Sequence, residues 1–226
     1  MTRRTTSTAC LLLVLAAAPA DALADNSFSI RVNSSWIGDS SFDVVSDNDL
    51  FAQAEFTFAR RLLSFWRGEV WVDAAYVAGT AKSDLFDGQT KTRALLQNVT
   101  FGARYAYPVF SWLVPYSRLG LGVGVGTFEL ESVVGASTVQ DRAAAFAGHF
   151  LLGVELLWPR RALLTGTSYL TAGILVEAGY GFGSRLGFDL TPEGDEDLKQ
   201  IPLAGVDIGG LSTNGWQLRV GGILRF

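Results

Sequence analysis

The chain has 226 residues, of which 49% are hydrophobic, 12% aromatic and 18% charged, and its mean hydropathy is +0.26. This apolar fraction excludes a disordered chain, and a formal net charge of −4 gives no electrostatic basis for binding nucleic acid. The only long apolar run, residues 9–18, is about half as long as the roughly 20 residues of a membrane-spanning helix, which excludes a helical membrane protein.

The first 24 residues have the features of a secretory signal. Arg3 and Arg4 precede the apolar run, and the segment ends on residues 22–24, Ala-Leu-Ala, which is typical of a cleavage site. We therefore expect an exported protein, with a signal peptide at 1–24 that is cleaved after Ala24 and a single domain at 25–226. The only cysteine, Cys10, leaves with the signal, so the mature chain gains its stability from a core or from a membrane and not from disulfides.

From residue 28 onward, apolar residues alternate with polar or small ones in eight segments, with the period of two that is typical of β-strands. In chain order, we expect the strands near residues 28–36, 53–58, 70–76, 98–105, 118–126, 145–156, 170–183 and 216–226. One face of each strand is large and apolar, and the other combines Gly, Ala and Thr with full charges.

These two faces distinguish a membrane barrel from a soluble sandwich. In a sandwich, glycines on the water-facing side would weaken the strands without an evident reason. In a small transmembrane barrel the apolar face contacts lipid, and the glycines leave room in a narrow interior for side chains from other strands. The sequence therefore predicts an all-β fold, an eight-stranded antiparallel up-and-down transmembrane β-barrel.

The predicted links between the strands alternate in length. The short links are 61–68, 108–115 and 158–166, and the longer ones are 38–49, 79–93, 129–142 and 186–214. Short turns on one side and long loops on the other are typical of outer-membrane barrels with both termini in the periplasm. Tryptophans near both ends of the strands predict aromatic girdles at the two membrane interfaces. These residues are Trp36, Trp66, Trp112, Trp158 and Trp216.

The last strand carries a family resemblance. The ending GWQLRVGGILRF, with outward Leu218, Val220 and Leu224 and with Phe226 at its end, resembles the strand by which outer-membrane proteins are recognised for barrel insertion. With eight strands and a signal, the chain resembles the small outer-membrane β-barrel superfamily that includes the OmpA transmembrane domain, OmpX and OmpW. The resemblance implies residence in the bacterial outer membrane, contact with its lipid and lipopolysaccharide, and assembly by the barrel-insertion machinery. We expect a monomer.

The inward faces carry four positive and four negative side chains and the only histidine. We predict that they form one polar network: Arg31, Glu55, Asp73, Arg104, Arg118, His149, Glu155, Glu177 and Arg219. Isolated charges inside lipid-facing walls are costly, so we expect ion pairs. Because eight strands enclose a space only wide enough for side chains, a filled interior is favoured over an open polar pathway.

The sequence indicates no enzyme, no cofactor and no metal site. Lipid A deacylases of this barrel size combine a histidine with a nearby serine and a glutamate, whereas apolar residues follow His149, and Glu155 lies about 20 Å further along the strand. The glycines at 120–126 resemble a phosphate loop but lie within a strand. The acidic run at 193–197 lacks the spaced ligands of a calcium loop.

The long links are acidic, which predicts an acidic outer rim. Its residues are Asp39, Asp43, Asp47, Asp49, Glu129, Glu131, Asp141, Asp189, Glu193, Asp195, Glu196, Asp197 and Asp207. The last link keeps some β character, which predicts a protruding ribbon suited to strand addition. The favoured function is a non-enzymatic barrel for envelope integrity or surface interaction, with an unknown surface ligand. The alternative is a conduit for small hydrophobic molecules of the OmpW type, and a lipid A-modifying enzyme is less favoured.

Overall fold

The computed structural model describes residues 26–46, 49–85, 90–132, 137–158, 170–188 and 210–226. Its long strands are β1 (Asn26–Trp36), β2 (Leu50–Phe65), β3 (Gly68–Leu85), β4 (Thr90–Ala106), β5 (Leu113–Ser132), β6 (Ser137–Leu157), β7 (Thr171–Gly183) and β10 (Gly215–Arg225). Its short elements are the 3₁₀-helix η1 (Ser40–Val44) and the strands β8 (Leu186–Gly187) and β9 (Gly210–Leu211). Among the described residues, no helix is long and apolar enough to cross a membrane. The predicted signal at 1–24 lies outside the described residues.

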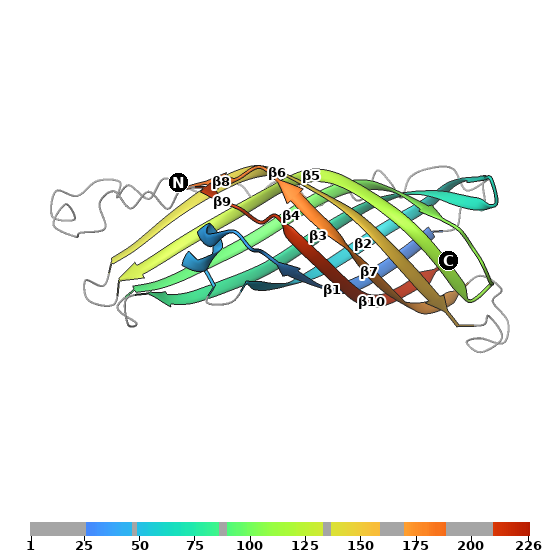
Figure 1. Ribbon diagram of the computed structural model, residues 1–226, viewed down its shortest axis with the longest axis horizontal. Coiled ribbons are helices and arrows are strands. Elements are labelled where there is room, and N and C mark those ends of the chain that lie inside the picture. The colour runs from blue at the N-terminus through green and yellow to red at the C-terminus, as the bar shows by residue number, and fades with distance from the viewer. Residues whose placement is uncertain (1–25, 47–48, 86–89, 133–136, 159–169, 189–209) are drawn as a thin grey trace, which may run out of the picture.

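The long strands close into one barrel. Each pairs antiparallel with its neighbours in the order β1-β2-β3-β4-β5-β6-β7-β10, and β10 returns to β1. The closing ladder runs from Ser27 opposite Arg225 to Trp36 opposite Trp216. All strands are strongly tilted to the long axis (Figure 1). The eight-stranded antiparallel up-and-down barrel predicted from the sequence is confirmed.

The outward side chains form an apolar surface. Ile30 and Val32 on β1 are 52% and 61% exposed, and the outward residues of the other strands are similarly open. On β10 these include Leu218, Val220 and Leu224. Apolar surface of this extent is unfavourable in water but suits lipid. The 11 residues of β1 span about 33 Å along the strand, or about 25 Å along the barrel axis at a tilt of about 40°, which matches the thickness of a membrane. The barrel is transmembrane.

The five predicted girdle tryptophans are all exposed and lie at the two ends of this surface. Trp36 and Trp216 face each other across the β1–β10 ladder, and the ring of Tyr180 packs edge-on against Trp216 at 5.7 Å. Trp66 and Trp112 lie at the opposite end, between β2 and β3 and between β4 and β5. Trp158 follows β6 at that same end.

We call the end where Asn26 pairs with Phe226, and where β2 connects to β3 and β4 to β5, the turn end. The connection between β2 and β3 is a two-residue turn in which Trp66 and Arg67 have φ angles of 48° and 66°. The link predicted at 61–68 is therefore wrong in extent, because β2 continues to Phe65. The cause is a register shift between Arg61 and Leu63, which interrupts the alternation on which the prediction relied.

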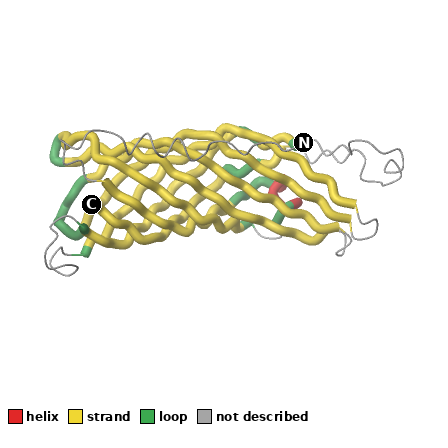
Figure 2. The backbone as a smooth tube through the Cα atoms, turned by 180° about the vertical axis from the view of Figure 1, so that it is seen from behind, coloured by secondary structure: helices red, strands yellow, loops and turns green. Residues whose placement is uncertain are grey.

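We call the opposite end the loop end. The links predicted at 79–93 and 129–142 are wrong, because strands occupy nearly all of both segments. The period of two continues there, but the outward residues change from apolar to charged, with Lys82 opposite Arg93 and Asp84 opposite Lys91. The strands β3 to β6 consequently extend beyond β1, β7 and β10 (Figures 1 and 2).

Candidate functional site

The barrel interior contains three layers of side chains along its axis. A charged layer lies in the middle, between an apolar cluster at the turn end and a second apolar cluster at the loop end. The turn-end cluster comprises Ala59, Trp71, Ala106, Val114, Tyr116, Leu157, Leu175 and Ile223. Because all of these side chains point inward from the strands, the space that the strands enclose is filled by the chain itself.

Glu55 is the centre of the charged layer. Its carboxylate lies 3.0 Å from Arg31, 2.9 Å from Arg118 and 2.7 Å from Arg219, and it also accepts a hydrogen bond of 2.8 Å from Thr57. These side chains come from four different strands, and Glu55 is fully buried. A single carboxylate thus ties β1, β2, β5 and β10 together across the interior.

Two further carboxylates balance these guanidinium groups. Asp73 accepts hydrogen bonds from Arg118 Nη2 at 2.7 Å and from Nε at 3.0 Å, the paired geometry of a strong ion pair. Glu177 accepts hydrogen bonds from Arg31 at 3.0 Å and from the hydroxyl of Tyr116 at 2.8 Å. Three carboxylates therefore face three guanidinium groups, and this group of side chains is neutral.

A second group lies closer to the turn end. Glu155 is paired with both Arg104 and Arg225. The same two guanidinium groups lie over the ring of Trp71, at 4.7 and 4.9 Å from its centre, and the Trp71 indole donates to Glu69 at 3.1 Å. Cation–π contacts of this kind add to the ion pairs.

The structure thus brings together eight of the nine residues that were predicted as a lumen network, in two groups. Four further members were missed: Glu69, Trp71, Tyr116 and Arg225. Alternation alone assigns Trp71 and Arg225 to the inner face. Glu69 was missed because it directly follows a segment that was predicted to be a link.

His149 lies among these residues but takes no part in their bonds. It is 3% exposed, and among the described side-chain hydrogen bonds and ion pairs none includes it. Its ring occupies the space above Gly120, where a Cβ would overlap it. The inward glycines were expected to leave room for side chains from other strands, and on β5 these are His149 at Gly120 and Asn98 at Gly124. The described residues contain no group of His, Cys, Asp and Glu that could hold a metal ion.

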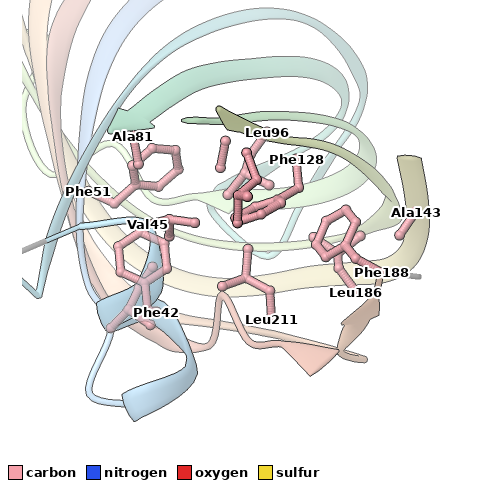
Figure 3. Packing of buried hydrophobic residues seen from close by; sticks show 13 residues of the cluster. Phe42, Val45, Phe51, Ala81, Leu96, Phe128, Ala143, Leu186, Phe188 and Leu211 are labelled. Atoms are coloured by element: carbon pink, nitrogen blue, oxygen red, sulfur yellow. The ribbon is translucent and has the colours of Figure 1, made fainter. Parts of the chain in front are cut away.

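The apolar cluster at the loop end combines inward side chains of the strands with side chains of the links that pack between them. Phe51, Ala81, Ala94, Leu96, Phe128, Leu130 and Ala143 come from the strands, and Ile37, Phe42, Val45, Leu186, Phe188 and Leu211 come from η1, from β8 and β9 and from residues beside them. Phe42 packs on Phe51 and Phe188 on Phe128, each at 5.6 Å between ring centres (Figure 3). Within the last link β8 and β9 pair antiparallel, as in the expected ribbon, and their Leu186 and Leu211 are buried in the cluster at the barrel mouth. The rest of that ribbon, like residues 193–197, lies outside the described residues.

Polar contacts hold the links over the mouth. The backbone N–H of Ser41 donates to Asp39 at 3.0 Å, and Arg185 pairs with Asp39 at 2.9 Å. The backbone N–H of Ser212 donates to the Ser41 hydroxyl at 3.1 Å. The hydrogen bond from the Ser41 backbone is the main reason why the pKa of Asp39 lies below its usual value. The first and last links are therefore joined to each other.

The acidic rim differs from its prediction. Glu129 and Glu131 lie on β5, opposite Arg93 and Lys91 on β4, and Asp141 lies on β6. The prediction that these acids belong to loops is wrong, because the segment continues as strand. The outer face of β3 to β6 is consequently a mixture of both charges.

No protein-family model matches this chain, and no curated protein matches its sequence. Among solved structures it is similar to Ail, the attachment invasion locus protein of Yersinia pestis, in complex with the heparin analogue sucrose octasulfate. That match has 13% identity and a TM-score of 0.46 and covers 90% of this chain and 99% of Ail. Neisserial surface protein A matches at 11% identity and a TM-score of 0.41, over 89% of this chain and 95% of its own. The N-terminal β-barrel domain of Pseudomonas aeruginosa OprF matches at 12% identity and a TM-score of 0.34, over 90% of this chain and 99% of that domain.

These identities and TM-scores are too low to assign a role to any residue of this chain. The architecture is established by the chain's own strand pairing, and the roles of its residues are argued from its own contacts. The resemblance to the small outer-membrane barrel superfamily is confirmed for the fold. The kind of membrane agrees as well, since transmembrane barrels of this design are proteins of bacterial outer membranes.

Proposed function

We propose that the chain is a non-enzymatic outer-membrane barrel that conducts neither ions nor solutes and acts through the part that lies beyond the outer lipid boundary. The observation that carries this proposal is the interior packed with buried side chains, in which a neutral group of buried ion pairs around Glu55 lies between two apolar clusters. In outer-membrane barrels the longer extensions beyond the membrane lie on the outer side, and here these are the ends of β3 to β6 and the link from β7 to β10, so we place the loop end at the cell exterior.

Electrostatics and packing both oppose conduction. An ion on the barrel axis would have to separate buried pairs such as Arg31–Glu55 and Arg118–Asp73, and removing one partner of such a pair costs about 3–5 kcal/mol. An ion would also have to pass the aromatic side chains at the mouth before reaching any charge. Both barriers favour a structural role for the charged layer.

Conduction is tested by reconstituting the purified barrel into planar bilayers. We expect no stable openings from the wild-type chain at moderate voltage. Stable, large openings would contradict the proposal. A matched preparation of Phe42→Ala, which removes a ring from the mouth but leaves the charged layer intact, is also expected to stay closed.

The alternative of a conduit for hydrophobic molecules requires an apolar cavity that reaches a gap in the wall. The apolar mouth of this barrel is filled by the chain's own residues, among them Phe42 and Phe188. The alternative of a lipid hydrolase requires a histidine that is bonded to a carboxylate, and His149 has no such bond among the described residues. Both alternatives are therefore less well supported than the closed barrel.

For the surface role, we propose lipopolysaccharide as the first partner. Lys82 and Arg93 face each other on the outer side of β3 and β4, just beyond Leu95, and both are exposed. Like charges directly opposite each other destabilise a sheet by up to about 1 kcal/mol, and a phosphate between them would offset this repulsion. Arg93 also lies opposite Glu129, so one carboxylate faces this pair of cations, whereas the neighbouring Lys91 is flanked by Asp84 and Glu131 on both sides.

This difference provides a matched pair of variants. Arg93→Gln and Lys91→Gln remove the same charge from neighbouring outward positions of one strand. We expect Arg93→Gln to weaken the binding of purified lipopolysaccharide to the detergent-folded barrel about fivefold and Lys91→Gln to have little effect. Equal effects of the two variants would contradict a specific contact at Lys82 and Arg93.

A further inference from the structure

The lipid-facing wall has an apolar groove of about 550 Å³ where β1, β10 and β7 run side by side. Ile30 and Ile174 form its sides and Gly222 its floor, since these three residues face outward in one row of the strand register. Toward the turn end it continues past Phe28 to Trp158. Its volume lies within the range of about 300–1,000 Å³ that is usual for ligand sites.

Gly222 is unlike the other glycines of the barrel strands. At those positions an added Cβ would come within about 3 Å of a neighbouring atom, so that packing requires glycine. At Gly222 the nearest atom would be the carbonyl oxygen of Gly173 at 4.0 Å, and its φ lies outside the left-handed region. Neither the backbone nor any neighbour requires a glycine there, although glycine weakens a strand by about 0.5–1 kcal/mol. The residue keeps the groove open.

A cationic side chain lies beside the turn end of this groove. Arg60 points outward from β2 and is a diagonal neighbour of Phe28, which places their Cα atoms roughly 7–8 Å apart. Arg60 is half-buried, and among the described residues it has no ion-pair partner. Trp158, which lines the turn end of the groove and is exposed, is the kind of residue that lies among lipid headgroups.

We propose that this groove binds one phospholipid of the periplasmic leaflet, with an acyl chain along Gly222 and the phosphate at Arg60. The position of each part agrees with this lipid. The apolar groove lies at the depth of the acyl chains, and Arg60 and Trp158 lie at the depth of the headgroups. An anionic phosphate supplies the oppositely charged partner that Arg60 lacks within the described part of the chain.

A second copy of the chain fits the groove less well. In a symmetric dimer the same surface of both copies meets, so that the two grooves would face each other around Gly222 and enclose an empty space. The two Arg60 side chains would also approach each other across that interface. An extended acyl chain fills a narrow groove without either disadvantage.

The experiment is native mass spectrometry of the detergent-folded barrel mixed with dipalmitoyl phosphatidylglycerol or, separately, with dipalmitoyl glycerol, which has the same chains and no phosphate. We compare the wild type with Gly222→Leu, which fills the groove, and with Arg60→Gln. The control is Ala103→Leu, which places the same side chain at an outward, exposed position on β4. The heat-dependent shift in gel mobility shows that each variant is folded.

We expect the wild type and Ala103→Leu to retain one phosphatidylglycerol, Gly222→Leu to retain at least fivefold less, and Arg60→Gln to lose its preference for phosphatidylglycerol over dipalmitoyl glycerol. Equal retention by Gly222→Leu and the wild type would overturn the site. Equal retention of the two lipids by the wild type would overturn the role of Arg60. A dimer that Gly222→Leu abolishes would identify a second copy as the occupant and overturn the lipid.

Discussion

Neutralising Glu55 tests whether the barrel depends on its internal charge balance. The substitution Glu55→Gln keeps the shape of the side chain but removes the charge that three guanidinium groups share. These belong to Arg31, Arg118 and Arg219, at 3.0, 2.9 and 2.7 Å. The variant therefore leaves one uncompensated positive charge in a space that the strands close off from water.

The size of the effect follows from the number of partners. Removing one partner of a buried pair costs about 3–5 kcal/mol, and the guanidinium groups around Glu55 are at most 2% exposed. Because Arg31 and Arg118 keep other carboxylates, we expect a loss of about 5 kcal/mol in the free energy of unfolding and not the sum of three pairs. Asp73→Asn deprives only Arg118 of a short ion pair, so we expect about 3 kcal/mol there.

The measurement is urea-induced unfolding and refolding in phospholipid vesicles, followed by tryptophan fluorescence and by gel mobility without heating. The control is Glu131→Gln, which removes the same charge from an exposed outward position, with an expected change within about 0.5 kcal/mol. If Glu55→Gln and Glu131→Gln unfolded at the same urea concentration, the argument from buried charge would be refuted. A larger loss for Asp73→Asn than for Glu55→Gln would refute the argument from the number of partners.

Three further predictions concern the two ends of the barrel. Arg67→Gly is expected to stabilise the barrel by about 1 kcal/mol in the same unfolding assay, because Arg67 has a φ of 66°, where a side chain is disfavoured. Phe128→Ala is expected to destabilise it by about 3 kcal/mol, since this ring is 1% exposed within the mouth cluster. Asp39 has a lowered pKa, so its carboxylate stabilises the folded first link. This stabilisation is complete above the pKa of an unfolded aspartate, about 3.9, and is lost as the pH falls through the lower folded value. The protection of the Ser41 amide against hydrogen exchange, relative to an unstructured peptide at the same pH, is therefore expected to fall over that acidic window, and in Asp39→Ala it is expected to be low at neutral pH as well.

Each of these predictions has a clear contrary result. Arg67→Ala relieves no backbone strain, so an equal gain from Arg67→Ala would show that the φ angle is not the cause. A loss below about 1 kcal/mol for Phe128→Ala would mean that the mouth is loosely packed. If the protection of the Ser41 amide did not change with pH, the Asp39 carboxylate would not be what orders the first link.

Alternation alone was enough to predict the faces of every strand. It assigned Arg31, Glu55 and Glu177 to the interior and Ile30 and Val220 to the lipid, because side chains alternate strictly across a β-strand and the two environments select opposite residues. Pairing of the inner charges followed from the cost of burying them singly. The specific partners did not follow, since the partners of Glu55 come from strands that are far apart in the sequence.

The ends of the strands were harder to predict because their surroundings change there. Beyond the lipid, an outward residue such as Lys82 is as polar as a loop residue. The alternation of apolar and polar residues therefore ends before β3 itself does. At the turn end, the irregularity near Leu63 shifts the alternation by one residue. The mouth filling was missed for a related reason. Phe42, Leu186 and Phe188 lie in links, where apolar residues have no regular spacing to reveal what they cover.

The order of the three inner layers keeps the charges around Glu55 away from both ends of the barrel. Water that approaches from the loop end meets Phe128 and Phe188 before the charges around Glu55. From the turn end it meets the partly exposed Glu69 and Arg225, and then the apolar cluster around Trp71. The ion pairs around Glu55 thus lie where side chains cover them on both sides, and there an electrostatic contact is stronger than in water and an unpaired charge is most costly. This arrangement suits a rigid support and opposes a pore, because a pore requires the charges to be wetted from at least one end. The exposed ends and the lipid-facing groove are then the parts of the molecule that remain available for partners.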